Sequence, residues 1–261
     1  VLPPSQKRLI EAMCMFDSRS GKTLTDVITG KGAGSMLLLH GPPGVGKTLT
    51  AEAVSELLKR PLYSCTVGEL GTTPERLEQK LTEVLTVCSA WEAVVLIDEA
   101  DVFLERRNND SIVRNACVGV FLRLLEYHSG LLFLTSNRID SFDSAFFSRV
   151  TMALRYTDLD ATARAKVFAN FFEMIGVKHL DPNEFSHHEL NGRQIRNVIR
   201  LAQALQQHNG DNQLTAEHIE TTVAVGQQFE ADVKLTASLS IMDDSFGRAA
   251  AATTTTTTTT T

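Results

Sequence analysis

Two patterns of apolar residues alternate along the chain between residues 36 and 156. Short runs of apolar residues, as in strands buried on both faces of a sheet, occur at 36–39, 61–66, 93–97, 130–136 and 151–156. Stretches with helical spacing of apolar residues lie between them, at 49–58, 75–89 and 111–127. This alternation predicts right-handed β-α-β units, and therefore an α/β fold with a five-stranded parallel sheet flanked by helices.

The pattern differs on either side of this region. Near the start, Leu9, Ile10, Met13 and Phe16 have helical spacing, and residues 17–35 are rich in residues typical of loops. These residues are expected to form a helix and a loop that precede the first strand.

After about residue 158 only helical patterns occur. They cover 161–175, 192–207 and 215–233, and Asn191 and Thr215 are candidate caps for the last two helices. The final alanines and threonines cannot specify a packed core. We therefore predict an α/β nucleotide-binding core at 1–157, a small all-helical domain at 158–235 and a tail at 236–261.

The segment after the first predicted strand has the sequence of a phosphate-binding loop. Residues 41–48, GPPGVGKT, match G-x-x-x-x-G-K-[ST] and lie between a strand and a helix. Glycines let several backbone N–H groups face one anion, and the helix dipole adds positive potential there. Lys47 would contact the β- and γ-phosphates, and the Thr48 hydroxyl would bind Mg²⁺. The predicted nucleotide-binding residues here are Gly41, Pro42, Pro43, Gly44, Val45, Gly46, Lys47, Thr48 and Leu49.

Two acids end the third predicted strand. Asp98 and Glu99 follow the apolar run 93–97, and parallel sheets bind ligands at the carboxyl ends of their strands. Asp98 is expected to hold Mg²⁺, and Glu99 is expected to polarise the attacking water. The alternative is a strand that simply ends in solvated acids, but the phosphate loop upstream favours the catalytic interpretation.

Two later residues are candidates with plain alternatives. Asn137 follows the fourth strand and could orient the attacking water, or it could simply occupy a turn. Arg149 could reach the nucleotide of a neighbouring subunit, or it could pair on the surface with Asp140 or Asp143. Spacing alone favours the surface pair for Arg149.

Candidates for further nucleotide contacts lie on both sides of the predicted sheet region. Val27 and Ile28 could form an apolar wall against the adenine ring, or they could simply pack within a loop. Arg193 and Arg196 could contact the nucleotide from the helical domain, or they could belong to a solvated helix face.

Composition limits the class of protein. The chain of 261 residues is 43% hydrophobic with a formal net charge of −6, which does not indicate a large nucleic-acid surface. No apolar stretch is long enough to span a membrane. The four cysteines form no C-x-x-C pair, so we expect neither a disulfide framework nor a cysteine-based zinc site, and we expect an intracellular, reducing compartment. Because the chain does not begin with Met, we expect a fragment, and the particular compartment stays open.

Together these segments resemble the AAA+ ATPases. GPPGVGKT and VVLIDEAD are similar to their Walker A and Walker B motifs, TSNR to sensor 1, FDSAFFSRV to the arginine-finger segment and NGRQIR to the sensor 2 helix. The resemblance covers roughly residues 1–230, and in detail it is to a large group of fungal AAA-type proteins. It implies a P-loop NTPase core, a helical lid, ATP and Mg²⁺ as ligands, and a homo-oligomer that is usually a hexameric ring. The roles that it implies are Mg²⁺ binding by Thr48 and Asp98, water activation by Glu99, a sensor at Asn137, a finger in trans at Arg149, and a lid arginine at Arg193, with Arg196 as second choice.

Two features depart from the pattern of this family. Ring translocases that resemble this chain carry an aromatic-hydrophobic-glycine pore loop, whereas residues 69–74, ELGTTP, are short and contain no aromatic residue. The finger segment has one arginine, Arg149, where many relatives have two. Residues 106–110, RRNND, could form another substrate-facing loop or a solvated polar loop.

The expected function is ATP hydrolysis coupled to remodelling or disassembly of a protein substrate, with sites shared between subunits of a ring. Two alternatives stay open. One is a nucleic-acid-associated ATPase. The other is an ATP-dependent assembly switch that does not thread polypeptide, which the short pore segment makes credible. The sequence does not identify the substrate.

Overall fold

The computed structural model describes residues 3–19, 34–104, 112–138, 142, 144–229 and 231–233. The chain divides into two compact units, Val1–Asp160 and Ala161–Thr261. The predicted tail at 236–261 lies outside the described residues.

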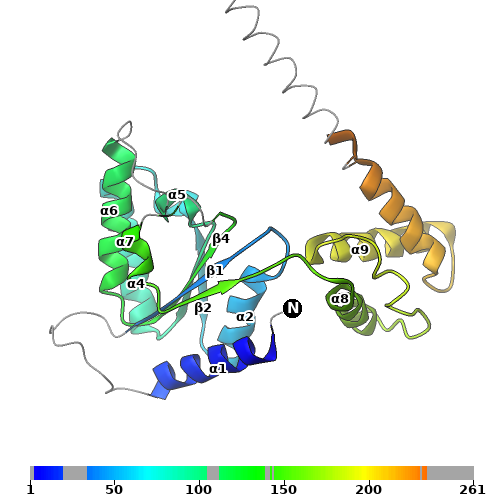
Figure 1. Ribbon diagram of the computed structural model, residues 1–261, viewed down its shortest axis with the longest axis horizontal. Helices are drawn as coiled ribbons and strands as arrows, with labels where there is room; N and C mark the ends of the chain where they lie inside the picture. Colours follow the sequence, from blue (N-terminus) through cyan, green and yellow to red (C-terminus); the bar gives the residue numbers. More distant parts are fainter. Residues whose placement is uncertain are drawn as a thin grey trace, which may run out of the picture. The chain divides into compact units, whose positions relative to one another are not determined.

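The first unit is built on one parallel sheet whose five strands follow the order β2-β3-β4-β1-β5. The strands are β1 (Ser35–His40), β2 (Leu62–Thr66), β3 (Val94–Asp98), β4 (Leu131–Ser136) and β5 (Met152–Arg155). All neighbouring strands pair in parallel, as the pattern of apolar runs predicts. The predicted α/β class is therefore confirmed, and the carboxyl ends of β1, β3 and β4 lie along one edge of the sheet (Figure 1).

Seven helices lie in the described part of this unit: α1 (Pro4–Arg19), α2 (Lys47–Leu58), α3 (Val67–Leu70), α4 (Pro74–Ala90), α5 (Asp101–Leu104), α6 (Ile112–Glu126) and α7 (Ser144–Phe147). The four longer helices coincide with predicted helices to within a few residues. The one-turn helices α3 and α5 are not among the helices predicted from the sequence. A single helical turn has too few residues to show an apolar period.

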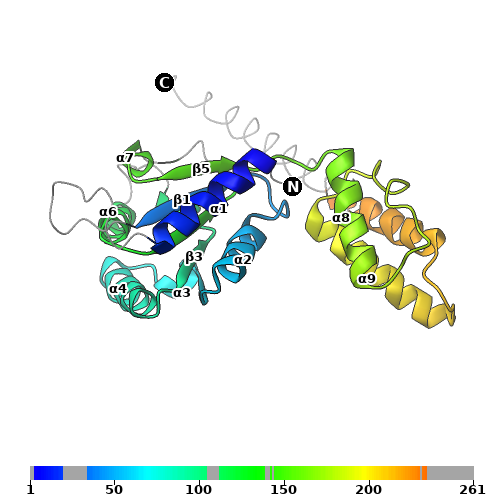
Figure 2. The same cartoon turned by 90° about the horizontal axis from the view of Figure 1, so that it is seen from below.

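Alternating side chains of the strands fill two separate cores. Val95 and Ile97 of β3 pack with apolar residues of α4 and α6 on one face of the sheet. Val94 and Leu96 pack with residues of α1 and α2 on the other face. Figures 1 and 2 show these two helical layers on opposite sides of the strands. Because both faces are covered, the strands are continuous apolar runs, and polar residues are left to the strand ends.

The second unit is helical in its described part. It contains α8 (Ala161–Met174), α9 (Gly192–Asn209) and helical residues 216–229. Asn191 caps α9 as predicted, because its Oδ1 accepts from the Gln194 N–H at 2.9 Å while the Gln194 side chain accepts from the Asn191 N–H at 2.7 Å. No helix in the part of the chain that the structure describes is long and apolar enough to cross a membrane.

Candidate functional site

The loop between β1 and α2 has the backbone of an anion cradle. Gly41, Gly44 and Gly46 have φ angles of 144°, 76° and 99°, which side chains rarely tolerate. At Gly41 an added Cβ would come within 2.1 Å of the Tyr156 carbonyl oxygen, so only glycine fits. The N–H of Gly41 donates to the Ser136 carbonyl at 3.2 Å, which pins the start of the loop to the end of β4.

Lys47 lies in the first turn of α2, where it is only 7% exposed. Its Nζ donates to the carbonyl oxygens of Gly41 and Pro42 at 2.8 and 2.7 Å and to Oδ1 of Asn137 at 2.9 Å. The ammonium is thus held directly against the loop. The contact also joins two predicted site residues, Lys47 and Asn137, which are 90 positions apart in the sequence.

Thr48 and Asp98 meet in the same cluster. The Thr48 hydroxyl lies 3.3 Å from both carboxylate oxygens of Asp98. Adjacent oxygen ligands of an octahedral Mg²⁺ lie roughly 2.9 Å apart, so this hydroxyl and this carboxylate suit the cation in chemistry and spacing. These two residues would hold Mg²⁺.

Thr135 supports both acids, and sequence reasoning missed it. This β4 residue is 1% exposed, and its hydroxyl donates to Oδ1 of Asp98 and accepts from the Glu99 N–H at 3.0 Å. Its carbonyl accepts from the Ala100 N–H at 2.9 Å. A buried hydroxyl residue directly after the apolar run 131–134 of β4, two positions before the predicted sensor Asn137, is the signal that could have identified it.

Glu99 has an unusual backbone conformation for a residue with a side chain. Its φ is 55°, in the left-handed region, which costs on the order of 1 kcal/mol outside glycine. The side chain is exposed at the carboxyl end of β3, beside the half-buried Asp98. The contact with Thr135 is one of the bonds that hold this conformation.

A second contact that supports the loop, and that the sequence did not reveal, joins Thr50 of α2 to Tyr156. The Thr50 hydroxyl lies 2.6 Å from the Tyr156 hydroxyl and 3.0 Å from the Gly46 carbonyl, to which it donates. Burial raises the pKa of Tyr156 to about 12. This pair ties the end of the loop to the segment after β5.

Arg149 lies at the opposite end of the sheet from the loop. It follows α7 just before β5, and the neighbouring Thr151 N–H donates to the Met36 carbonyl at the start of β1. Gly41 is five positions after Met36, which corresponds to about 16 Å in an extended strand. Arg149 donates from Nη2 and Nε to Oε2 of Glu126, at 2.9 and 3.2 Å. The alternative partners of Arg149 that the sequence offers, Asp140 and Asp143, lie outside the described residues.

Several predicted contacts are not brought to the loop by the described structure. Val27, Ile28 and the loop 106–110 lie outside the described residues. Arg193 and Arg196 are both exposed at the start of α9 in the second unit, and their role in nucleotide binding stays a prediction.

Comparison with known proteins identifies the family. Residues 37–157, which span the loop, Asp98 and Asn137, match the family described as "ATPase family associated with various cellular activities (AAA)". This segment of the chain is an AAA domain of that family. Members of this family bind and hydrolyse ATP, and they commonly assemble into rings.

Individual relatives share this domain within proteins of different sizes. The chain is 28% identical to the fly (Drosophila melanogaster) "ATPase family AAA domain-containing protein 3A homolog", over 55% of this chain and 25% of that protein. It is 28% identical to the Arabidopsis thaliana "ATPase family AAA domain-containing protein FIGL1", over 68% of this chain and 28% of that protein. It is 26% identical to "CD-NTase-associated protein 6" of Pseudomonas aeruginosa, over 74% of this chain and 75% of that protein. The chain therefore spans about a quarter of the length of the first two relatives.

Proposed function

We propose that this AAA+ ATPase couples ATP hydrolysis to remodelling of a protein substrate, in a ring whose sites are shared between neighbouring subunits. The observation that carries the hydrolytic part is the convergence of Lys47, Thr48 and Asp98 at the carboxyl ends of two strands. A strand-borne carboxylate, a helix-borne hydroxyl and a loop-held ammonium are the groups that a metal-bound triphosphate needs.

Each residue of this cluster has a distinct role in the proposal. The loop N–H groups and Lys47 bind the phosphates, and Thr48 and Asp98 would hold the Mg²⁺ whose charge offsets that of the phosphates. The exposed carboxylate of Glu99 accepts a proton from the water that attacks the terminal phosphorus. Asn137, held by the Lys47 ammonium, presents a neutral amide that orients this water without repelling the phosphate.

The position of Arg149 supports a site shared between subunits. Because Arg149 lies near the amino ends of the strands, it is about a strand length from the loop of its own chain. A guanidinium this far away cannot contact its own nucleotide, but it can reach a site across a subunit interface. The ion pair with Glu126 would then orient it, since both side chains are about a quarter exposed, at 27% and 25%.

One observation favours the second candidate, an assembly switch that does not thread polypeptide. The segment where translocases of this type carry a pore loop is here occupied by α3, whose Leu70 is only 1% exposed. A buried leucine cannot grip a passing chain, and only Gly71, Thr72 and Thr73 separate α3 from α4. ATP-dependent assembly without threading would use the same nucleotide site.

Substitution of Glu99 tests the hydrolytic proposal. Glu99→Gln should leave ATP binding intact and lower kcat by about 10² to 10⁴, the usual contribution of a general base. Phosphate release and fluorescent-nucleotide binding measure the two effects. The matched control is Glu56→Gln, which changes an exposed glutamate of α2 and should leave the activity normal. An unchanged kcat in Glu99→Gln would remove Glu99 from the mechanism.

Mixing two inactive variants tests the shared site. Arg149→Ala and Lys47→Ala should each be inactive alone, and mixing them should restore part of the activity because some interfaces then combine an intact Arg149 with an intact Lys47. Absence of any rescue, with mixed assemblies demonstrated by size-exclusion chromatography, would contradict the shared site.

A fluorescent substrate protein that stays folded while ATP controls oligomer size would select the assembly switch.

A further inference from the structure

Two adjacent histidines and a glutamate come together in the second unit, and none of the three is used in the nucleotide-site proposal. Each of His187, His188 and Glu220 offers one ligand atom, and these atoms all lie within 4.8 Å of one another. The histidines belong to the connection between α8 and α9, and Glu220 belongs to the helical residues 216–229. We propose that these three residues bind one divalent transition-metal ion of the zinc class.

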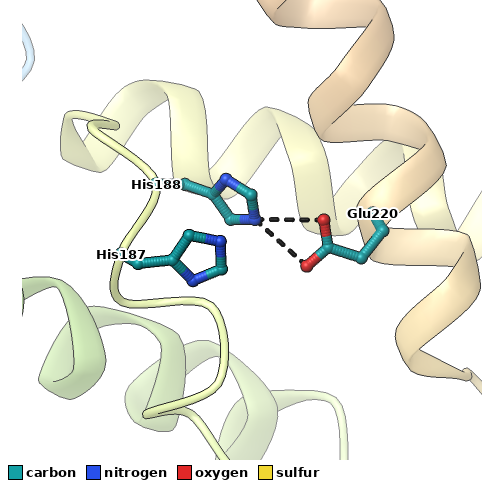
Figure 3. A group of neighbouring side chains, drawn as sticks. All are labelled: His187, His188 and Glu220. Carbon is teal, nitrogen blue, oxygen red and sulfur yellow. Dashed lines mark hydrogen bonds and ion pairs between the residues drawn. The ribbon is translucent and has the colours of Figure 1, made fainter.

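The contact between His188 and Glu220 already has the spacing of two ligands on one ion. Nε2 of His188 lies 3.0 and 3.1 Å from the two carboxylate oxygens of Glu220 (Figure 3). Two ligands 2.0–2.1 Å from a tetrahedral Zn²⁺ lie about 3.4 Å apart, so a small outward adjustment admits the ion. The His188 side chain is only 11% exposed, which limits competition from water at its nitrogen.

The hydrogen bond of His187 fixes which of its nitrogens can bind metal. Nδ1 lies 2.8 Å from the Glu184 carbonyl oxygen, which can only accept, so Nδ1 carries the proton and Nε2 has the free lone pair. A backbone carbonyl that orients a histidine through its other nitrogen is the arrangement found around metal-binding imidazoles. In Figure 3 one ring nitrogen of His187 faces the side of Glu220, and the two imidazole rings lie 3.8 Å apart between centroids.

Both backbones that carry these ligands are anchored by packing. Phe185, two residues before His187, is fully buried against the rings of Phe168 and Phe172. On the other side, Ile219 is fully buried, and the Thr222 hydroxyl donates to a carbonyl of α9 at 3.4 Å. The site therefore needs only side-chain adjustment when the ion binds, and the ion would fasten the α8–α9 connection to the last described helix.

The ligand set determines the class of metal. Two imidazoles and one carboxylate suit Zn²⁺ and its neighbours in the transition series, whereas Mg²⁺ and Ca²⁺ prefer oxygen ligands throughout. Three protein ligands leave a fourth position for water. The site is independent of the nucleotide cluster, so a failure of either proposal leaves the other unaffected.

Zinc titration of the tag-free full chain tests the site. Calorimetry with Zn²⁺, in the presence of excess Mg²⁺, should show one saturable site per chain, and Co²⁺ should give the intense visible absorption of tetrahedral coordination. Glu220→Gln and His187→Ala should each weaken binding by at least about tenfold. His208→Ala removes an exposed histidine of α9 that is outside the cluster, and it should bind zinc as the unmodified chain does.

Two results would overturn the proposal. One is the absence of a saturable zinc site in the unmodified chain. The other is zinc affinity that is unchanged by both Glu220→Gln and His187→Ala, which would place the metal elsewhere and reduce His188 and Glu220 to an ion pair. Glu220→Gln preserves the shape of the side chain, and circular dichroism checks that this variant is folded. Its zinc affinity therefore tests the proposed site even if a histidine variant fails to fold.

Discussion

Replacing Thr135 by valine tests whether one buried hydroxyl positions both acids of the nucleotide site. Valine has nearly the same shape as threonine, so the change leaves no cavity and removes only the hydroxyl. Two bonds are lost: the one donated to Asp98 and the one accepted from the Glu99 N–H. The side-chain hydrogen bonds of Thr135 go to Asp98 and Glu99 and not to the loop or Lys47, so phosphate binding by the loop and Lys47 should be spared.

The structure sets the size of the expected effects. A hydrogen bond to a carboxylate contributes about 1.5–3 kcal/mol, and an N–H left without a partner costs about 1–3 kcal/mol. The free energy of unfolding should therefore fall by roughly 2.5–6 kcal/mol. If about 1.4–2.8 kcal/mol of that positioning acts in the transition state, kcat falls about 10- to 100-fold. The backbone of Glu99 has a φ of 55°, so loss of its N–H partner should let it relax from this conformation.

The assay separates positioning from simple destabilisation. Phosphate release at saturating ATP gives kcat, and nucleotide binding with and without Mg²⁺ reports on Asp98. Thr135→Val should lower kcat and the Mg²⁺-dependent part of the affinity, while Mg²⁺-independent binding stays normal. Thr135→Ser keeps the hydroxyl and should retain most of the activity. A Thr135→Val enzyme with kcat within about twofold of the original, or a serine variant that is equally impaired, would refute the reasoning.

Three further predictions concern Gly41, Tyr156 and His128. Gly41→Ala should abolish nucleotide binding and lower the melting temperature, because the new methyl group would lie 2.1 Å from the Tyr156 carbonyl; a variant with normal ATP affinity would contradict this. Tyr156→Phe should lower the free energy of unfolding, measured with urea, by about 1 kcal/mol, because it removes the hydrogen bond to Thr50. Adding Thr50→Val to this variant should lower the free energy of unfolding little further, because the same hydrogen bond is already lost. Burial lowers the pKa of His128 below 6.5, so the unfolded chain binds more protons and stability should fall as pH decreases below about 6.5. Urea unfolding at pH 7.5 and 5.5 should show a smaller acid loss in His128→Gln than in the original chain, and an equal loss would argue against a buried neutral imidazole.

The strands, the longer helices and the phosphate loop could be predicted from sequence because their signals are local. The run VVLI, at 94–97, is apolar throughout because β3 is covered on both faces, and the glycines of GPPGVGKT occupy the positions where the loop backbone needs a positive φ. Asn191 could be predicted as a cap for the same reason, since its partner is three residues away.

The residues that sequence reasoning missed act through contacts between distant segments. Thr135 reaches Asp98 from 37 residues away, and Thr50 meets Tyr156 across 106 residues. No periodicity records such a pair, because each threonine alone is an ordinary strand or helix residue. The partner of Arg149 was missed in the same way, since Glu126 is 23 residues earlier and lies at the end of a different helix.

The geometry of a parallel sheet also restricts how subunits could share a site. The loop lies at the carboxyl ends of the strands, whereas Arg149 lies near their amino ends, so the two are on different surfaces of one unit. A two-fold dimer joins identical patches, and would not in general pair one surface with the other. A contact in which Arg149 completes a neighbour's site is therefore heterologous, and repeating it gives a closed ring or an open helical filament. Under this proposal Arg149→Ala should disable the site of the neighbour and leave its own loop able to bind ATP, so its nucleotide affinity as an isolated subunit should be normal.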